Sequence, residues 1–278
     1  MKRIVPLAAL SALVLLVAAR KPDDPKHENW FSPVSTPASD IVGLAVDQAQ
    51  AQQEFLQLGV KITNKSGDDM LIVMRDEAEF VLPSGSFTAK PSALFKGPFI
   101  IPPKGTKGHT FKVDGGTGFH VDAFTFKPRG FYSAPDTGEP VSVPEFQLPP
   151  SQNDFTSGPF ACKLKDTKQA TDETTAAFAC TYDGKGIGIV DAARMAVKVP
   201  DGKEFANAAR KPPRDILLPG ESTKVVATFR VDAKVVDMQF ATLQVLWRDT
   251  LSESPMKPVA LEDWAFQLDP ARTAEANE

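Results

Sequence analysis

Apolar and polar residues alternate along several stretches of the chain. Between Leu56 and Thr63 the even-numbered positions are apolar and most of the odd-numbered ones are polar. The same alternation runs through residues 160–165 and 224–231. A period of two places one set of side chains on a core and the other in water, as in a β-strand. No helical stripe of comparable length occurs, so the pattern predicts an all-β protein.

Glycine and proline interrupt the chain about every ten residues, and the 24 prolines leave little room for long helices. Short alternating strands with frequent turns favour β-sandwiches over alternating β–α units. Composition predicts these boundaries: a signal peptide at 1–19, a Pro-rich tether at 20–39, a first module at 40–149, a linker at 150–158, a second module at 159–270 and a flexible tail at 271–278.

Turn motifs recur in the same order at a nearly constant spacing. Gly67 and Gly184 follow apolar strands and lie 117 residues apart, and Gly85 and Gly202 repeat that spacing. Three further pairs follow: turns ending at Gly105 and Gly220, 115 apart, Thr-Phe-x-Val-Asp at Thr110 and Thr228, 118 apart, and Phe-Gln-Leu at Phe146 and Phe266, 120 apart. Five ordered anchors predict that one module has been duplicated.

The N-terminus resembles a secretory signal. Lys2 and Arg3 precede an apolar run from Ile4 to Ala19, which is 16 residues and therefore short for a membrane span. Residues 16–19 resemble the lipobox of bacterial lipoproteins, but Arg20 stands where the lipidated cysteine belongs. We therefore expect export to the periplasm or cell envelope, and lipidation only if position 20 were cysteine.

Charge narrows the choice of partner. The formal net charge is −4, and removal of Lys2 and Arg3 with the signal makes it −6. An acidic chain is not expected to bind nucleic acid. We expect another envelope protein as partner, with membrane proximity through the N-terminus.

The order of turns resembles a family of bacterial immunoglobulin-like modules that occurs in secreted proteins and lipoproteins. The second module carries Asp201-Gly202-Lys203 and Leu218-Pro219-Gly220-Glu221-Ser222, and the first carries the looser Pro103-Lys104-Gly105-Thr106. The resemblance covers nearly all of the mature chain. It implies two tandem immunoglobulin-like β-sandwiches and supplies no catalytic residue.

Catalytic motifs are missing from the sequence. The chain has three histidines, of which His27 falls in the tether and His109 and His120 fall in or beside expected strands. Neither is accompanied by an unusual density of serine or aspartate, and no nucleophile-elbow, zinc-protease, P-loop or dinucleotide motif is present. The sequence predicts that the protein is not an enzyme; a hydrolase with an unrecognised site is the alternative.

A second resemblance concerns metal. Residues 62–71 and 116–120 resemble segments of periplasmic copper chaperones, which bind copper through His and Met. His120 is followed by Val121 and Asp122, so the soft sulfur ligand of that motif is missing. Met70 and Met74 are expected to be core or edge residues. We expect no metal or cofactor and keep a copper or ligand carrier as an alternative.

The aromatic residues divide into two groups. Phe111, Phe229, Phe240 and Phe266 fall at apolar strand positions and are expected in the cores. The residues expected to make surface contacts are Trp30, Phe31, Phe119, Phe131 and Tyr132.

A disulfide is expected between Cys162 and Cys180. Export permits oxidation, and two cysteines leave none over. Antiparallel strands centred near Thr171 would place the two opposite each other and facing the same core. Their counterparts 118 residues earlier are Leu44 and Ile62, which should touch.

These features together predict a non-catalytic cell-envelope protein that acts as a binding, spacer or assembly module.

Overall fold

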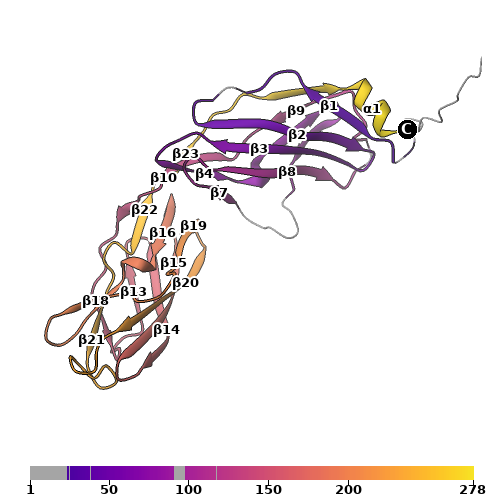
Figure 1. Ribbon diagram of the computed structural model, residues 1–278. Coiled ribbons are helices and arrows are strands. Elements are labelled where there is room, and N and C mark those ends of the chain that lie inside the picture. The colour runs from indigo at the N-terminus through magenta and orange to yellow at the C-terminus, as the bar shows by residue number, and fades with distance from the viewer. Residues whose placement is uncertain (1–23, 25, 38, 91–97, 117) are drawn as a thin grey trace, which may run out of the picture.

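The computed structural model describes residues 24, 26–37, 39–90, 98–116 and 118–278, so the expected signal peptide and Arg20 lie outside the described residues. The described chain is all-β, with antiparallel pairing throughout and one short α-helix. It forms two lobes, each with its own hydrophobic core (Figure 1).

The first lobe is built from twelve strands and the helix. An eight-stranded sheet has the order β6-β5-β9-β24-β1-β2-β3-β8, and a four-stranded sheet has the order β23-β10-β4-β7. The bounds are β1 (Asn29–Pro33), β2 (Val42–Gln52), β3 (Phe55–Asn64), β4 (Asp69–Val73), β5 (Glu79–Leu82), β6 (Gly85–Thr88), β7 (Phe99–Ile101), β8 (Thr106–Asp114), β9 (Ala123–Lys127), β10 (Phe131–Pro135), β23 (Lys257–Pro258), β24 (Trp264–Leu268) and α1 (Pro270–Ala276).

The second lobe contains the remaining twelve strands in three four-stranded sheets. Their orders are β13-β14-β15-β20, β11-β22-β16-β19 and β12-β21-β17-β18. The bounds are β11 (Glu139–Pro140), β12 (Phe146–Leu148), β13 (Asp154–Ser157), β14 (Phe160–Gln169), β15 (Glu173–Tyr182), β16 (Ile187–Asp191), β17 (Ala196–Lys198), β18 (Glu204–Ala206), β19 (Arg214–Leu217), β20 (Ser222–Arg230), β21 (Leu243–Leu246) and β22 (Leu251–Ser254).

The two lobes share one pairing scheme, which fits the expected repeat. Each strand from β1 to β10 corresponds to the strand twelve places later, and β23 and β24 correspond to β11 and β12. The one difference is that β24 pairs with β1, whereas β12 and β13 belong to separate sheets. In register, Trp264 opposite Phe126 corresponds to Phe146 opposite Val245. Trp264 and Phe146 are 118 residues apart, whereas Phe266 and Phe146 are 120 apart. The structural counterpart of Phe146 is therefore Trp264, and the two Phe-Gln-Leu motifs are offset from each other by two residues.

The last two strands of each repeat are exchanged between the lobes. β12, at the end of the first repeat, pairs with β21 of the second lobe. β24, at the end of the second repeat, pairs with β9 and β1 of the first lobe. The expected module boundaries at 149 and 270 follow the sequence repeat, whereas the lobes are completed by strands that cross them.

Two terminal segments are more ordered than composition suggested. The expected tether contains β1, whose Phe31, Ser32 and Pro33 pair with β24. The expected flexible tail forms α1, which Asp269 caps by accepting a hydrogen bond from the Arg272 backbone N–H. Proline and polar residues do not prevent order here because each segment pairs with the other.

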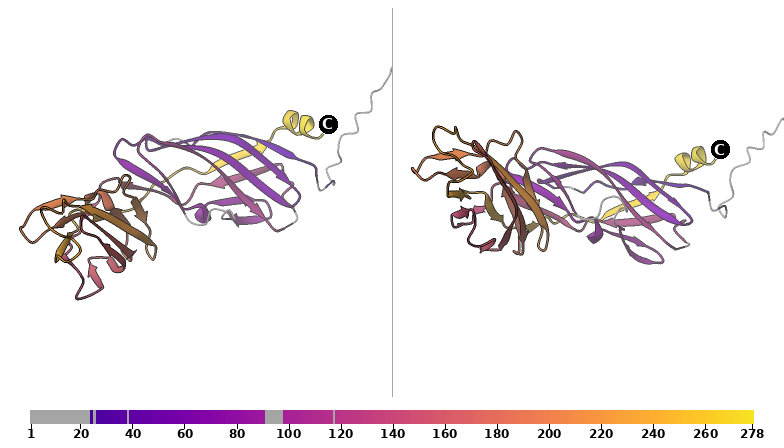
Figure 2. Two further views of the ribbon diagram at one scale, coloured as in Figure 1. Left: turned by 60° about the horizontal axis from the view of Figure 1, so that its bottom comes forward. Right: turned by 90° about the horizontal axis from the view of Figure 1, so that it is seen from below.

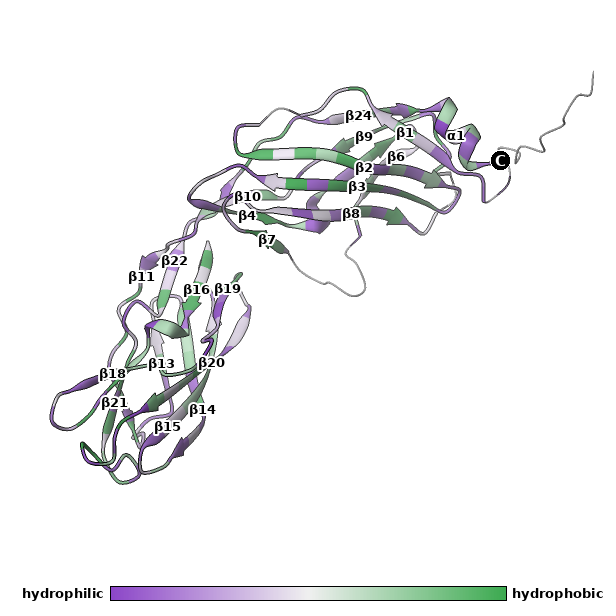
Figure 3. Cartoon of the chain, in the orientation of Figure 1, coloured by the Kyte–Doolittle hydropathy of each residue, from purple (hydrophilic) through white to green (hydrophobic). Residues whose placement is uncertain are grey.

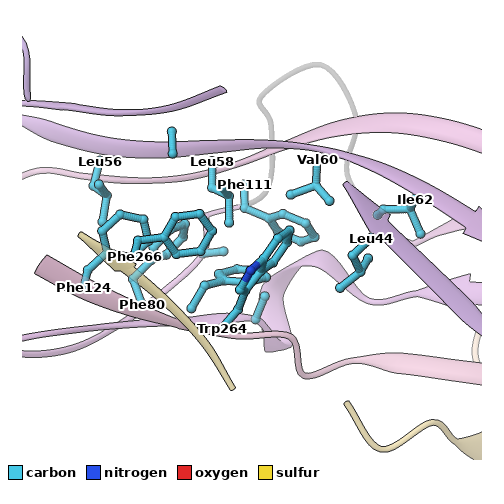
Figure 4. Packing of buried hydrophobic residues seen from close by; sticks show 14 of the residues in the cluster. Leu44, Leu56, Leu58, Val60, Ile62, Phe80, Phe111, Phe124, Trp264 and Phe266 are labelled. Atoms are coloured by element: carbon cyan, nitrogen blue, oxygen red, sulfur yellow. The ribbon is translucent and has the colours of Figure 1, made fainter. Parts of the chain in front are cut away.

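Strand parity predicted the core residues correctly. Leu56, Leu58, Val60 and Ile62 are all buried, and Figure 4 shows them facing the aromatic residues of β5, β9 and β24. The buried face of β14 carries Phe160, Cys162 and Leu164. Figure 3 shows apolar and polar residues alternating along the strands of both lobes. Burial of one strand face is therefore the main source of stability in each lobe.

Two chain crossings and an apolar cluster join the lobes. β10 runs through Asp136 into β11, and β22 runs through Pro255 and Met256 into β23; β10 pairs with β23, and β11 with β22. Figure 2 shows the lobes joined through this narrow region. The joint cluster comprises Met70, Ile72 and Ala134 from the first lobe and Ile187 and Ile189 from the second.

Polar contacts add to this joint. Arg214 forms an ion pair with Asp136 at 3.2 Å, and Ser254 Oγ donates to the Pro135 carbonyl at 2.9 Å. Over the described ranges the longest helix is α1, of 7 residues, so no helix there is long and apolar enough to traverse a bilayer.

Candidate binding surface

The expected disulfide is present. Cys162 of β14 lies directly opposite Cys180 of β15, with a Cα separation of 4.1 Å. Their counterparts Leu44 and Ile62 are also directly opposite, on β2 and β3. The disulfide is consistent with an oxidising compartment outside the cytoplasm.

His109 has the environment of a packing residue. Its ring on β8 lies 5.0 Å from the Phe99 ring and 4.7 Å from the Phe111 ring. Burial, followed by the charges of Arg75 and Lys107, lowers its pKa to about 4. The imidazole is therefore neutral near pH 7. Besides these rings, Asp47, Thr106 and Thr110 line the same surface pocket as His109.

The other two histidines lie together at the end of the first lobe. The His27 and His120 rings meet edge to face at 5.7 Å, and His120 Nε2 lies 2.8 Å from the His27 carbonyl oxygen. Within the described ranges, no group of three or more His, Cys, Asp or Glu residues is placed to hold a metal ion. Met70 is buried in the joint cluster, away from this pair.

Three of the five expected surface aromatics are buried instead. Phe31, Phe119 and Phe131 belong to the first core, because the N-terminal segment is a strand and the glycine turn folds Phe119 against Phe87. The other two are half-buried: Trp30 lies beneath the Arg272 guanidinium at 4.6 Å, and Tyr132 donates to Glu77.

A cleft of about 790 Å³ beside the joint contains Gly184, Lys185 and Glu253. The Tyr182 hydroxyl donates to Glu253 Oε1 at 2.6 Å and accepts from the Gly186 backbone N–H. Burial and the Glu253 bond raise the pKa of Tyr182, so its hydroxyl stays protonated. This arrangement holds the 183–186 turn against β22.

The far-end loop, residues 231–242, connects β20 to β21 at the end of the second lobe remote from the first (Figure 1). It carries the most exposed large apolar side chain among the described residues, Phe240 at 80 %, and Val235 at 41 %. The expectation that Phe240 belongs to the core is therefore wrong. Its position follows apolar spacing, but the chain turns there instead of forming a strand.

This loop is held in one conformation. Met238 is fully buried, and its N–H donates to Thr171 O at 2.9 Å while its carbonyl accepts from Gln169 Nε2 at 3.0 Å. The carboxylates of Asp232 and Asp237 each accept a backbone N–H two residues on. A buried anchor and two aspartate turns hold the segment that exposes Phe240.

The surface around Phe240 is acidic. The loop, the adjacent β14–β15 hairpin and the end of β20 carry Asp172, Glu173, Asp232 and Asp237 against Lys168, Arg230 and Lys234. Arg230 is already paired with Glu173 at 2.7 Å. Exposed aromatic side chains are frequent at the centres of protein-binding surfaces.

The corresponding end of the first lobe is covered by its own chain. Gly118 N and Phe119 N donate to Gln53 O, which corresponds to Thr171 O of the second lobe. Phe119 therefore corresponds to Met238, and both side chains are buried. Asn29 Nδ2 donates to the Val121 carbonyl, and the Leu268 N–H donates to the Asp122 carbonyl, in the loop that follows Phe119. The sequence did not reveal the exposed loop of the second lobe. Only a comparison of the two folded lobes shows that the contacts made by Asn29 and Leu268 in the first lobe have no equivalent there among the described residues.

Comparisons with known proteins identify no family. No family model matches the chain, and no curated protein matches it. Red sea bream transglutaminase aligns over 80 % of this chain and 31 % of its own, with 9 % identity and a TM-score of 0.19. The D431N mutant VP2 protein of infectious bursal disease virus aligns over 90 % and 70 %, with 9 % identity and a TM-score of 0.21. These similarities are too low to carry an argument about fold or function.

Proposed function

We propose that this protein is a non-catalytic component of the cell envelope, in which two immunoglobulin-like lobes form a stiff spacer. In this proposal the spacer presents the far-end loop to a partner protein. The chemistry of that loop defines the partner, which carries an apolar pocket bordered by basic side chains.

The joint is the observation that carries the spacer role. A single flexible linker would allow the lobes to move independently, as is the default for modules in series. Here the chain crosses between the lobes twice, from β10 to β11 and from β22 to β23. β10 pairs with β23, β11 pairs with β22, and an apolar cluster lies beside them. Bending the joint would break strand pairing and expose that cluster.

The ends of the molecule support an orientation. Glu28, just before β1, and α1 lie together at the end of the first lobe away from the second (Figure 1). An apolar N-terminus held at a membrane would place the far-end loop on the opposite side. Its acidic border disfavours an anionic lipid surface, so a protein is the better partner.

Stiffness is tested by spin labels at Lys61 and Lys224, which are both exposed, one on each lobe. We expect a narrow distance distribution by double electron–electron resonance. A distribution as broad as that of a flexible linker would contradict the spacer role.

Partner binding is tested by a photoreactive residue at Gln239, beside Phe240. The expected result is one crosslinked envelope protein that disappears in a Phe240→Ser background and weakens at high salt. Val34→Ser is the matched control, because Val34 is an exposed apolar residue of the first lobe, at 58 %. An unchanged crosslink in Phe240→Ser would contradict the proposed contact without affecting the spacer result.

A further inference from the structure

β24 is a central strand of a lobe to which it is not adjacent in sequence. It lies between β9 and β1 in the eight-stranded sheet, with Trp264 opposite Phe126 and Leu268 opposite Phe31. Without β24, β9 and β1 would face each other across a vacant strand position. Such a slot offers unpaired N–H and C=O groups on both sides and accepts an extended segment.

The same strand fills part of the core. Trp264 and Phe266 are 0 % and 1 % exposed, and the Phe266 ring stacks on Phe124 at 4.7 Å. Figure 4 shows both side chains among the residues of β2, β3 and β9. Removal of the strand would open this core to water, so the slot strongly favours being filled.

Helix α1 fastens the segment to the N-terminal strand. Asn277 accepts from the Glu28 N–H and donates to the Glu28 carbonyl. The Trp30 N–H donates to Thr273 Oγ1, and Ser32 donates to Asp269. These contacts link the segment to β1 of the first lobe and none of them involves the second lobe.

The covalent path to this segment is short. β22 ends at Ser254 in the second lobe and β23 begins at Lys257 in the first, so Pro255 and Met256 form the whole connection. All of β1 to β10 precede the second lobe in sequence. The slot in the first lobe therefore stays open until the last part of the chain arrives.

From the slot, its filling segment and this hinge, we infer that residues 257–278 are an exchangeable donor segment, which completes the first lobe of its own chain or of a second copy. Two copies that exchange this segment reciprocally form a closed dimer. This inference concerns self-assembly and does not depend on the far-end loop or its partner.

The exchange changes few contacts. Every pairing of β23, β24 and α1 is the same whether the segment comes from the same chain or another. The contacts that change are those of the joint, where the hinge at Pro255 and Met256 must open and Met256 packs against the joint cluster. Reciprocal exchange leaves no open slot, which favours a closed pair over a filament. Because the segment is covalently linked to its own chain, the monomer predominates at low protein concentration. Folding at high protein concentration favours the exchanged dimer.

Engineered cysteines test the exchange in the full chain. Thr125 of β9 and Ala265 of β24 are directly opposite. One copy carries Thr125→Cys and a second, differently tagged copy carries Ala265→Cys. After co-refolding over a range of concentrations, we expect a disulfide-linked dimer that increases with concentration. Mixing the two folded proteins should give no such dimer, because the segment is then already seated.

Two controls make the result decisive. A single chain with both substitutions reports whether the pair can form a disulfide in this fold. Pairing Thr125→Cys with Glu262→Cys, which lies outside the register, should give no dimer. If the double variant closes its internal disulfide but co-refolded chains give no dimer at any concentration, the inference is overturned.

Discussion

The two lobes have the same strand order but complete and stabilise it differently. The first lobe receives β24 from the far end of the chain, and Asn277 at the end of α1 hydrogen-bonds to Glu28, which is 249 positions earlier. The second receives β12 from just upstream and carries a disulfide between cysteines 18 residues apart. The first lobe thus depends on long-range pairing and the second on local closure.

The ends of the lobes differ in the same way. Asn29 and Leu268 hydrogen-bond to Val121 and Asp122 at the end of the first lobe, whereas the loop at the equivalent end of the second lobe leaves Phe240 exposed. A duplicated module has two equivalent ends but only one pair of chain termini. The end without a cover is the one available to another molecule.

The largest effect should come from removing the side chain that completes each lobe. Trp264→Ala should destabilise the first lobe by about 3–5 kcal/mol through lost burial and a cavity. Phe146→Ala, at the corresponding position, should act on the second lobe. Hydrogen exchange read strand by strand distinguishes them. Faster exchange confined to β14, β15 and β20 in Trp264→Ala would contradict the assignment of β24 to the first lobe.

The disulfide should matter only to the second lobe. Cys162→Ala with Cys180→Ala should lower its free energy of unfolding by about 3 kcal/mol, because the unfolded chain loses a constraint. The reverse experiment places Leu44→Cys with Ile62→Cys in the first lobe, where the residues are opposite. Oxidation of that pair should raise the unfolding midpoint of the first lobe. If neither experiment changes stability, a disulfide between these strands does not stabilise a lobe.

Acid should weaken the first lobe before the second, because His109, whose pKa is lowered by burial, lies in the first. The pKa of His109 is about 4 in the folded state, below the ordinary histidine value of 6.5, so the unfolded chain binds a proton first as pH falls. The stability that depends on neutral His109 is fully present above pH 6.5 and is lost as the pH falls toward 4. Allowing for partial exposure, we expect a loss of about 2 kcal/mol.

Denaturant titrations of the first lobe at pH 7 and pH 5 measure this loss. His109→Gln should reduce the pH dependence over that interval, while the second lobe serves as an internal control. An equal loss in the wild-type protein and His109→Gln would show that another group is responsible.

The smallest effect on stability is expected at the far-end loop. Phe240→Ala should change the free energy of unfolding by less than about 0.5 kcal/mol, because the side chain is already in water. Phe119→Ala, at the covered end, should cost several times more. Equal losses in thermal unfolding would mean that Phe240 packs in the core and is unavailable to a partner.

The sequence by itself determined the local features of the fold. Alternation identified the buried faces of β3, β14 and β20, and an offset of 118 residues placed Cys162 opposite Cys180 and Leu44 opposite Ile62. These are properties of neighbouring strands, which periodicity and turn chemistry control.

Only the tertiary structure decided which repeat each final strand completes. β12 and β24 have the same pattern and fit either lobe, so no local signal distinguishes pairing within a repeat from exchange between repeats. The same holds for Phe240, whose apolar spacing resembles that of a strand. Its exposure comes with the turn that the chain makes between β20 and β21, because burial depends on which segments pack against a residue and not on the residue itself.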